Sequence, residues 1–180
     1  MNNTKIVNIV SSSWVCQLDI ITLAKALPRC IYEPDTFAGL VYRRKAPDCT
    51  VIMFASGRMV STGVKSIKDV KSSIYTTVFE IEKIFSKKCY IDNLKIENIV
   101  AVHNLGIKLN LKYLFKKLNN VSYDSEKFPG MVYRNHIGKS VLIFSSGKLV
   151  FTGTKSRREL NELASEICQK IYNVLDDNSV

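Results

Sequence analysis

The residues with the clearest chemical potential occur in two copies. Residues 54–66 return as residues 144–156, with eight of thirteen positions identical and Arg58 answered by Lys148. Aromatic and basic side chains in such a repeat suit binding of a nucleic acid better than bond cleavage. The chain has only two histidines, no carboxylates clustered at metal-ligand spacing, and no Ser/His/Asp or Cys/His set. We therefore expect no catalytic residue, no metal site and no cofactor.

The duplication extends over most of the chain. Residues 5–10 match residues 95–100, and residues 37–43 match residues 128–134, at an offset of about 90 residues. This period exceeds the roughly 20–50 residues of solenoid repeats. We expect two complete repeats, residues 1–90 and 91–180, related by a pseudo-twofold axis. Such symmetry suits a two-sided target such as a duplex.

Composition indicates a globular, cationic protein. The apolar fraction of 46% is enough for a buried core, and the formal charge is +10. The first ninety residues hold 13 Lys and Arg against 7 Asp and Glu, and the second ninety hold 13 against 9. The positive charge predicts a polyanionic binding partner, and a nucleic acid is favoured over a membrane surface. A basic protein that binds neither is the alternative.

The cysteines and the hydropathy of the sequence indicate where the protein is located. Five scattered cysteines without a C-x-x-C pair indicate reduced thiols and neither a disulfide framework nor a zinc site. The sequence has no apolar run of 18 residues and does not begin like a secretory signal. We expect a soluble, intracellular protein.

The elements that position the repeated motifs follow from periodicity. Apolar stripes at helical spacing predict a short helix near residues 18–27 and 111–118 and a long one near 67–85 and 160–174. Ser66 and Ser156 are placed as N-caps of the long helices. Strands are expected at residues 6–10, 37–44, 50–55 and 58–62 and at their counterparts in the second half, joined as antiparallel meanders.

Strand alternation then predicts which side chains avoid the helices. If Val51 and Met53 face the helices, Ile52 and Phe54 face away from them. The outward face carries Asn, Val, Ile, Phe, Thr and Arg, which is too apolar for an ordinary solvent-facing surface. The same alternation predicts that Glu97 points to the helix side.

These residues resemble a known family, the conserved core of the TATA-box-binding proteins. The shared motifs are the two Asn-Ile-Val segments, the two Phe-x-Gly-x-Val-Tyr-Arg segments and the two Phe-x-Ser-Gly-[Arg/Lys]-x-Val-x-Thr-Gly-x-Lys segments, which together cover both halves. The resemblance implies an α+β fold in which two pseudo-symmetric repeats form a saddle of ten-stranded antiparallel sheet with four helices on the convex side. Members of this family bend minor-groove DNA by inserting apolar wedges.

The resemblance assigns a role to each outward residue. Four phenylalanines would intercalate into base steps: Phe37, Phe54, Phe128 and Phe144. Ten residues would contact the minor groove: Asn8, Val10, Ile52, Val60, Thr62, Asn98, Val100, Leu142, Val150 and Thr152. Four basic residues would contact phosphates: Arg43, Arg58, Arg134 and Lys148. Packing roles for the valines and phenylalanines were the competing interpretation.

Partners and location are implied more indirectly. The loop before the second Phe motif retains Asp124 and Glu126 as expected contacts for transcription factor IIB, while Lys127 replaces a usual hydrophobe. Transcription factor IIA or other regulators are further expected partners, and the free protein could form a homodimer through its apolar face. Asp35 stands where the family carries basic residues. A nuclear location is expected, with the cytoplasm of an archaeon as the alternative.

The function implied is that of a general transcription initiation factor that binds and bends TATA-box DNA and nucleates assembly of the preinitiation complex. Two alternative functions are compatible with the fold. One is a divergent relative acting mainly as a non-specific DNA-binding protein or a protein-interaction platform. The other is an enzyme that uses this fold to dock nucleic acid, for which the sequence offers no catalytic site.

Overall fold

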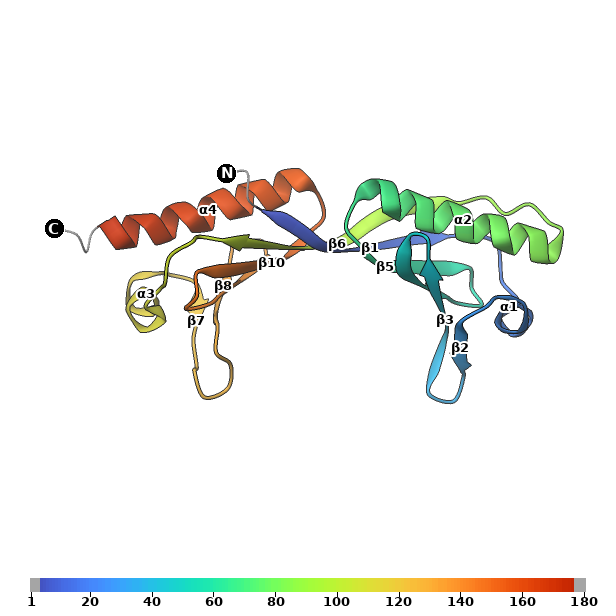
Figure 1. Cartoon of the computed structure of the whole chain (residues 1–180), viewed down its shortest axis with the longest axis horizontal. Coiled ribbons are helices and arrows are strands. Elements are labelled where there is room, and N and C mark those ends of the chain that lie inside the picture. The colour runs from blue at the N-terminus through green and yellow to red at the C-terminus, as the bar shows by residue number, and fades with distance from the viewer. Residues whose placement is uncertain (1–3, 177–180) are drawn as a thin grey trace. The chain divides into compact units, whose positions relative to one another are not determined.

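The computed structural model describes residues 4–176, which fold into ten strands and four helices. The strands are β1 (Lys5–Trp14), β2 (Cys30–Glu33), β3 (Phe37–Lys45), β4 (Asp48–Met53), β5 (Arg58–Val64), β6 (Asp92–Asn104), β7 (Val121–Ser122), β8 (Met131–Arg134), β9 (Ser140–Ile143) and β10 (Lys148–Thr154). The helices are α1 (Ile20–Ala26), α2 (Ile67–Phe85), α3 (Leu111–Lys117) and α4 (Arg157–Asp176) (Figure 1).

The order of the strands in the sheet reflects the duplication in the sequence. The sheet runs β2-β3-β4-β5-β1-β6-β10-β9-β8-β7, so its second five strands repeat the first five in reverse order. Neighbouring strands within each half pair antiparallel, as short connections require. The predicted ten-stranded antiparallel sheet with four helices is confirmed.

The chain divides into two compact units. Residues Asn8–Glu97 form one, here called the first unit, and the described residues on either side of it form the other, the second unit. The boundaries between the units fall inside β1 and β6. The division into sequence repeats 1–90 and 91–180 stays a prediction, since a compact unit is defined by contacts and a repeat by sequence.

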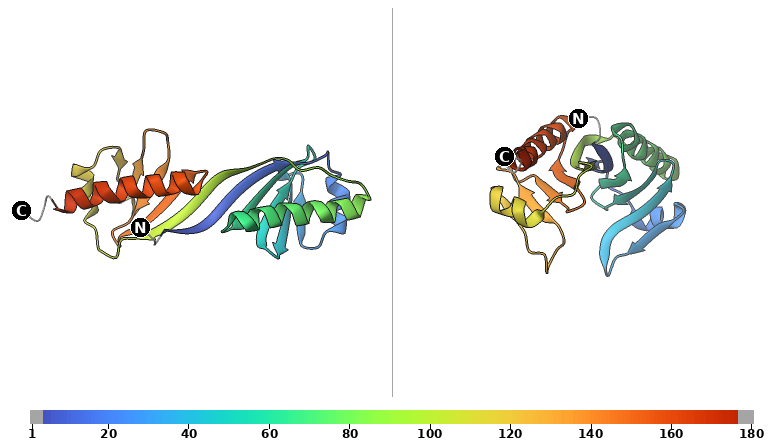
Figure 2. Two further views of the ribbon diagram at one scale, coloured as in Figure 1. Left: turned by 90° about the horizontal axis from the view of Figure 1, so that it is seen from above. Right: turned by 60° about the vertical axis from the view of Figure 1, so that its left-hand side comes forward.

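In each unit one long helix covers one face of the strands. Helix α2 packs on β4 and β5 in the first unit, and α4 packs on β10 in the second (Figure 2). The buried residues on α2 include Val70, Ile74 and Ile81, which step around one side of the helix. They meet the buried strand residues Val51 and Met53, so the core lies between helix and sheet.

The helix starts follow capping chemistry. The Ser66 hydroxyl accepts a hydrogen bond from the Asp69 amide, and Ser156 does the same for Glu159, both at 3.1 Å, which confirms the two predicted caps. Within residues 4–176, no helix has the length and apolarity to cross a membrane.

Candidate nucleic-acid interface

The predicted outward residues of the first unit do share the face that α2 leaves uncovered. Ile52 lies opposite Val60, and Thr50 lies opposite Thr62, in the β4–β5 ladder. Residues directly opposite in a ladder point to the same side. All four are half-buried, whereas their neighbour Val51 is fully buried under the helix. We call this side of the sheet the uncovered face.

The second unit repeats this arrangement. Leu142 lies opposite Val150, and Ser140 lies opposite Thr152, in the β9–β10 ladder. The register also adds four residues that sequence analysis missed, because each pairs with a residue already placed on the uncovered face. They are Val41 and Ser12 in the first unit and Val132 and Val102 in the second.

The four phenylalanines form two edge-to-face pairs. The ring centroids of Phe37 and Phe54 lie 5.9 Å apart with an interplanar angle of 72°, and those of Phe128 and Phe144 lie 5.8 Å apart at 66°. The first ring of each pair in the sequence is exposed, at 44% for Phe37 and 38% for Phe128. Each unit therefore presents one aromatic pair that is only partly covered by protein.

Steric contact explains why glycine occupies the third position of each Phe-x-Gly motif. A Cβ atom built on Gly39 would lie 2.6 Å from Cε1 of Phe37, and one on Gly130 would lie 2.7 Å from Cε1 of Phe128. Contacts this short do not occur, so only glycine allows the ring to lie against the strand backbone two residues later. The spacing in the motif thus fixes the ring position.

Two asparagines are held in the same orientation. Asn8 Oδ1 accepts a hydrogen bond from the Gly63 amide at 2.8 Å, and its Nδ2 donates to Thr62 Oγ1 at 3.3 Å. Asn98 repeats both contacts with Gly153 and Thr152 at the same distances. Because Oδ1 is engaged by a backbone amide and one N–H by the threonine, the second side-chain N–H is the group that remains for a ligand. The minor-groove edges of A·T pairs present acceptors only.

The Thr-Gly motif creates this asparagine site. The pairing of β1 with β5 shifts between Ile9 and Ser11, and the corresponding shift in β10 lies between Phe151 and Thr154. Gly63 and Gly153 occupy these irregularities with φ of +99° and +88°, a conformation that favours glycine. Each bulge turns one amide N–H away from the ladder and toward the asparagine.

The predicted phosphate-binding residues border the uncovered face. Arg43 pairs with Thr50, and Thr50 pairs in turn with Thr62 on the next strand. In the second unit Arg134 pairs with Ser140, and Ser140 pairs with Thr152. Arg58 is two residues before Val60 on β5 and shares its side of the strand. Lys148 is its counterpart on β10, and all four cations are exposed.

One orientation predicted from the sequence is wrong. Glu97 does not point to the helix side, because its Oε1 accepts a hydrogen bond at 2.6 Å from Ser12, which lies opposite Val60 on the uncovered face. Strict alternation misled the prediction. In β1, Ile6 and Ile9 are both buried although three residues apart, so the alternation breaks between them, and Glu97 is the repeat counterpart of Val7 in that stretch.

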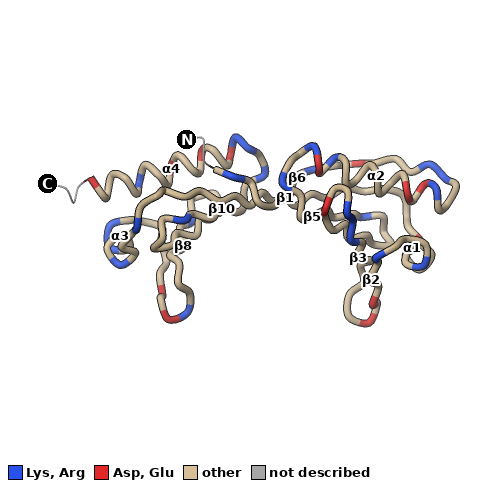
Figure 3. The backbone as a smooth tube through the Cα atoms, viewed as in Figure 1, with Lys and Arg blue, Asp and Glu red and all other residues tan. Residues whose placement is uncertain are grey.

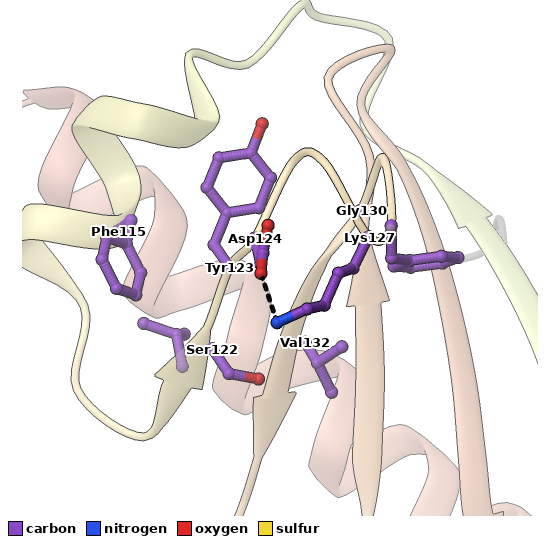
Figure 4. Close-up of a pocket in the computed structure, with 9 residues that line it drawn as sticks. Phe115, Ser122, Tyr123, Asp124, Lys127, Gly130 and Val132 are labelled. Carbon is purple, nitrogen blue, oxygen red and sulfur yellow. Dashed lines mark ion pairs between the residues drawn. The ribbon is translucent and has the colours of Figure 1, made fainter.

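The predicted partner loop lies between β7 and β8. Asp124 forms an ion pair with Lys127 at 3.0 Å beside a cavity of about 430 Å³ (Figure 4). The hydrogen bond from Lys127 lowers the pKa of Asp124. Phe115 and Phe128 line the same cavity, and Glu126 is exposed on the loop. Lys127 thus engages the acidic side chain that was expected to contact a partner.

Charge also marks the tip of the β2–β3 connection. Glu33 and Asp35 make this turn acidic, in contrast to the basic residues on β3 (Figure 3). Within residues 4–176, no three His, Cys, Asp or Glu side chains come together in a way that could hold a metal ion.

Comparison with known proteins finds one family. The sequence model described as transcription factor TFIID (or TATA-binding protein, TBP) matches residues 3–84 and 93–174. The chain is 36% identical over 178 residues to the TATA-box-binding protein of Picrophilus torridus, covering 97% of each sequence, and 42% identical over 157 residues to that of Methanothermobacter thermautotrophicus, covering 86% of this chain and 87% of that one.

A solved structure agrees with these sequence matches. The structure described as Methanococcus jannaschii TBP superimposes with a TM-score of 0.84 at 34% identity, covering 95% of this chain and 99% of that one. The relatives named here are archaeal, and they give no support to the nuclear location expected from composition.

Proposed function

This chain belongs to the TATA-binding protein family, and from that premise we propose how its uncovered faces serve transcription initiation. It is a TATA-binding-protein-like initiation factor and not an enzyme. We propose that the uncovered face of each unit contacts one half of a TATA element in the minor groove. The observation that carries this proposal is the pair of asparagine amides, each held by a glycine N–H and a threonine hydroxyl so that one N–H donor remains for the groove.

Sequence preference would come from the apolar residues around these amides. Val10, Ile52 and Val60 in the first unit, and Val100, Leu142 and Val150 in the second, offer no acceptor for the guanine amino group. A G·C pair would bury that donor unsatisfied, at a cost of about 1–3 kcal/mol. The proposed surface therefore favours A·T pairs, with Thr62 and Thr152 supporting the asparagines.

Bending would come from the two aromatic pairs. We propose that Phe37 and Phe54 wedge into one base step and that Phe128 and Phe144 wedge into another. Unstacking costs a few kcal/mol per step and is offset by contact with the widened groove. Arg43, Arg58, Arg134 and Lys148 would bind phosphates and orient the protein without reading the sequence.

We also propose protein partners for this chain. Asp124 and Glu126 would contact transcription factor IIB, with Lys127 released from Asp124 when the partner binds, and transcription factor IIA or other regulators would bind elsewhere. Without DNA, the uncovered apolar surface would pair two copies of the chain. For location we propose the archaeal alternative, the cytoplasm, because the relatives named above are archaeal.

Competitive binding tests this function against the platform alternative. A labelled TATA duplex is titrated with the protein and displaced by an unlabelled TATA duplex or by one in which G·C pairs replace the A·T pairs. We expect the TATA competitor to displace the probe at a concentration at least about tenfold lower. Equal displacement by both competitors would identify a non-specific binder.

A further inference from the structure

Two cysteine sulfur atoms meet on the first unit, away from its uncovered face. Cys16 follows β1 and precedes α1, while Cys89 lies between the end of α2 and the start of β6. Their Sγ atoms are 2.7 Å apart although the residues are 73 positions apart in the sequence. Cys30, Cys49 and Cys168 make no such contact with another cysteine among the described residues. Of the five cysteines, only Cys16 and Cys89 are therefore brought into contact with each other among the described residues.

The surroundings hold this pair in place and leave it open to reagents. The Cys89 amide donates to Glu82 Oε1 at 2.9 Å, which fixes the segment after α2. On the other side, the Val15 amide donates to the Gly57 carbonyl at 2.9 Å, which fixes the segment after β1. A cavity of about 290 Å³ lined by Gln17, Phe85 and Lys87 reaches both cysteines.

We propose that Cys16 and Cys89 are a redox modification site that closes to a reversible disulfide when a small-molecule disulfide such as oxidised glutathione is available. A disulfide bond is about 2.05 Å long, so the two sulfurs need to approach by only about 0.7 Å. Both cysteines lie in connections between elements, where a shift of this size disturbs no helix or strand hydrogen bond.

The reaction is an exchange of thiols and disulfides. Cys16, the more exposed partner, attacks one sulfur of the small disulfide as a thiolate, forms a mixed disulfide and releases one small thiol. Cys89 then attacks Cys16 Sγ and expels the second small thiol. Two protein thiols are oxidised, and one disulfide is reduced to two thiols. Burial raises the pKa of Cys89 to about 11, so the second step is expected to accelerate as pH rises toward that value.

The cross-link would lock the first unit. It ties the connection between β1 and α1 to the end of α2 and closes a long loop, which restricts the unfolded chain. The Cys16 segment also contacts the β4–β5 turn, where the Leu18 amide donates to the Ala55 carbonyl at 3.0 Å. That turn directly follows Phe54. Oxidation is therefore expected to stabilise the turn beside one aromatic pair.

The experiment uses the full chain equilibrated in glutathione buffers of increasing oxidised fraction. We expect the intact mass to fall by two hydrogen atoms, peptide mapping to join Cys16 to Cys89, and the melting midpoint to rise by about 5 °C or more. Cys16→Ser and Cys89→Ala should abolish the loss of two hydrogen atoms, with Cys89→Ala left as a mixed disulfide with glutathione at Cys16, while Cys30→Ser should keep the loss.

Alkylation of the unmodified protein gives an independent readout if a variant fails to fold. Oxidised protein should protect Cys16 and Cys89 from iodoacetamide and release both on reduction. Labelling of both residues in oxidised buffer, or a disulfide joining any other pair, would overturn the proposal.

Discussion

Ser12 donates a hydrogen bond to Glu97, with Oγ and Oε1 2.6 Å apart, on the uncovered face of the first unit. The repeat counterparts of these residues are Val102 and Val7, which form no hydrogen bond of this kind because both are apolar. The two otherwise matched halves therefore differ at this point. A carboxylate lies on a surface that we propose binds a polyanion, and the ammonium group of Lys95 lies 3.3 Å from it.

Replacing this carboxylate should strengthen DNA binding. In Glu97→Gln the Ser12 hydroxyl keeps an acceptor while the negative charge is removed, so we expect the dissociation constant for a TATA duplex to fall by about threefold or more at low salt. Because salt screens the repulsion, the gain should shrink as the salt concentration rises. Glu162→Gln, on the exposed side of α4, serves as the control and should leave affinity unchanged. An unaltered affinity for Glu97→Gln would place the carboxylate outside the DNA contact.

The asparagine site can be tested without removing its structural bond. In Asn8→Asp and Asn98→Asp, a carboxylate oxygen still accepts from the Gly63 or Gly153 amide, but the N–H donors are lost. We expect the melting midpoint to change little and the affinity for the TATA duplex to fall by about tenfold or more per site. Fluorescence anisotropy and thermal melting measure the two effects separately. Tight binding by the double variant would remove the asparagines from the site.

The steric role of Gly39 predicts an indirect effect on bending. In Gly39→Ala the new methyl group would lie 2.6 Å from the Phe37 ring and 2.8 Å from Cγ2 of Ile52, and the exposed ring can move aside without unfolding the strand. We expect reduced bending of a doubly labelled TATA duplex and a small loss of thermal stability from the contact with Ile52. Ala38→Ser, at the exposed neighbouring position, is the matched control. Normal bending by Gly39→Ala would show that the observed ring position is not needed.

An ion pair between a buried arginine, Arg44, and a half-buried glutamate, Glu80, supports the first unit from the helix side. Arg44 is 8% exposed, and its Nη1 lies 2.7 Å from Glu80 Oε2 and 3.0 Å from Thr77 Oγ1. Glu80→Ala leaves this guanidinium without its counterion, so we expect a loss of about 2 kcal/mol or more in the free energy of unfolding.

The matched control for this pair is an exposed one. Glu162→Ala breaks the pair with Arg158, whose side chain is 87% exposed, and should cost less than about 0.5 kcal/mol. Urea unfolding compares the two variants. Equal losses would mean that the Arg44 charge is adequately solvated without Glu80.

Much of this fold could be predicted because the duplicated motifs and the periodicity point to the same elements. Ser66 and Ser156 are recognisable as caps since a hydroxyl directly precedes each long amphipathic stretch. The edge strands β2 and β7 were not identified from periodicity alone. They contain only four and two residues, and pairing with β3 and β8, not their own pattern, makes them strands.

The site was predictable where strands are regular and not where they deviate. Ile52 and Val60 follow simple alternation, so their shared face was expected. The position of Glu97 depends on a break in strand alternation that cannot be recognised from the residue types in that strand. The Cys16–Cys89 contact joins segments far apart in the sequence. Such features depend on tertiary packing, which local patterns do not contain.

Base substitution tests most directly whether this protein reads and bends TATA DNA through the minor groove. Inosine·cytosine pairs present the minor groove of an A·T pair, without the guanine amino group, but the major groove of a G·C pair. Binding and end-to-end energy transfer are measured on TATA, inosine-substituted and guanine-substituted duplexes. We expect the inosine duplex to bind and bend like TATA while the guanine duplex does not. An inosine duplex that behaves like the guanine duplex would contradict minor-groove reading.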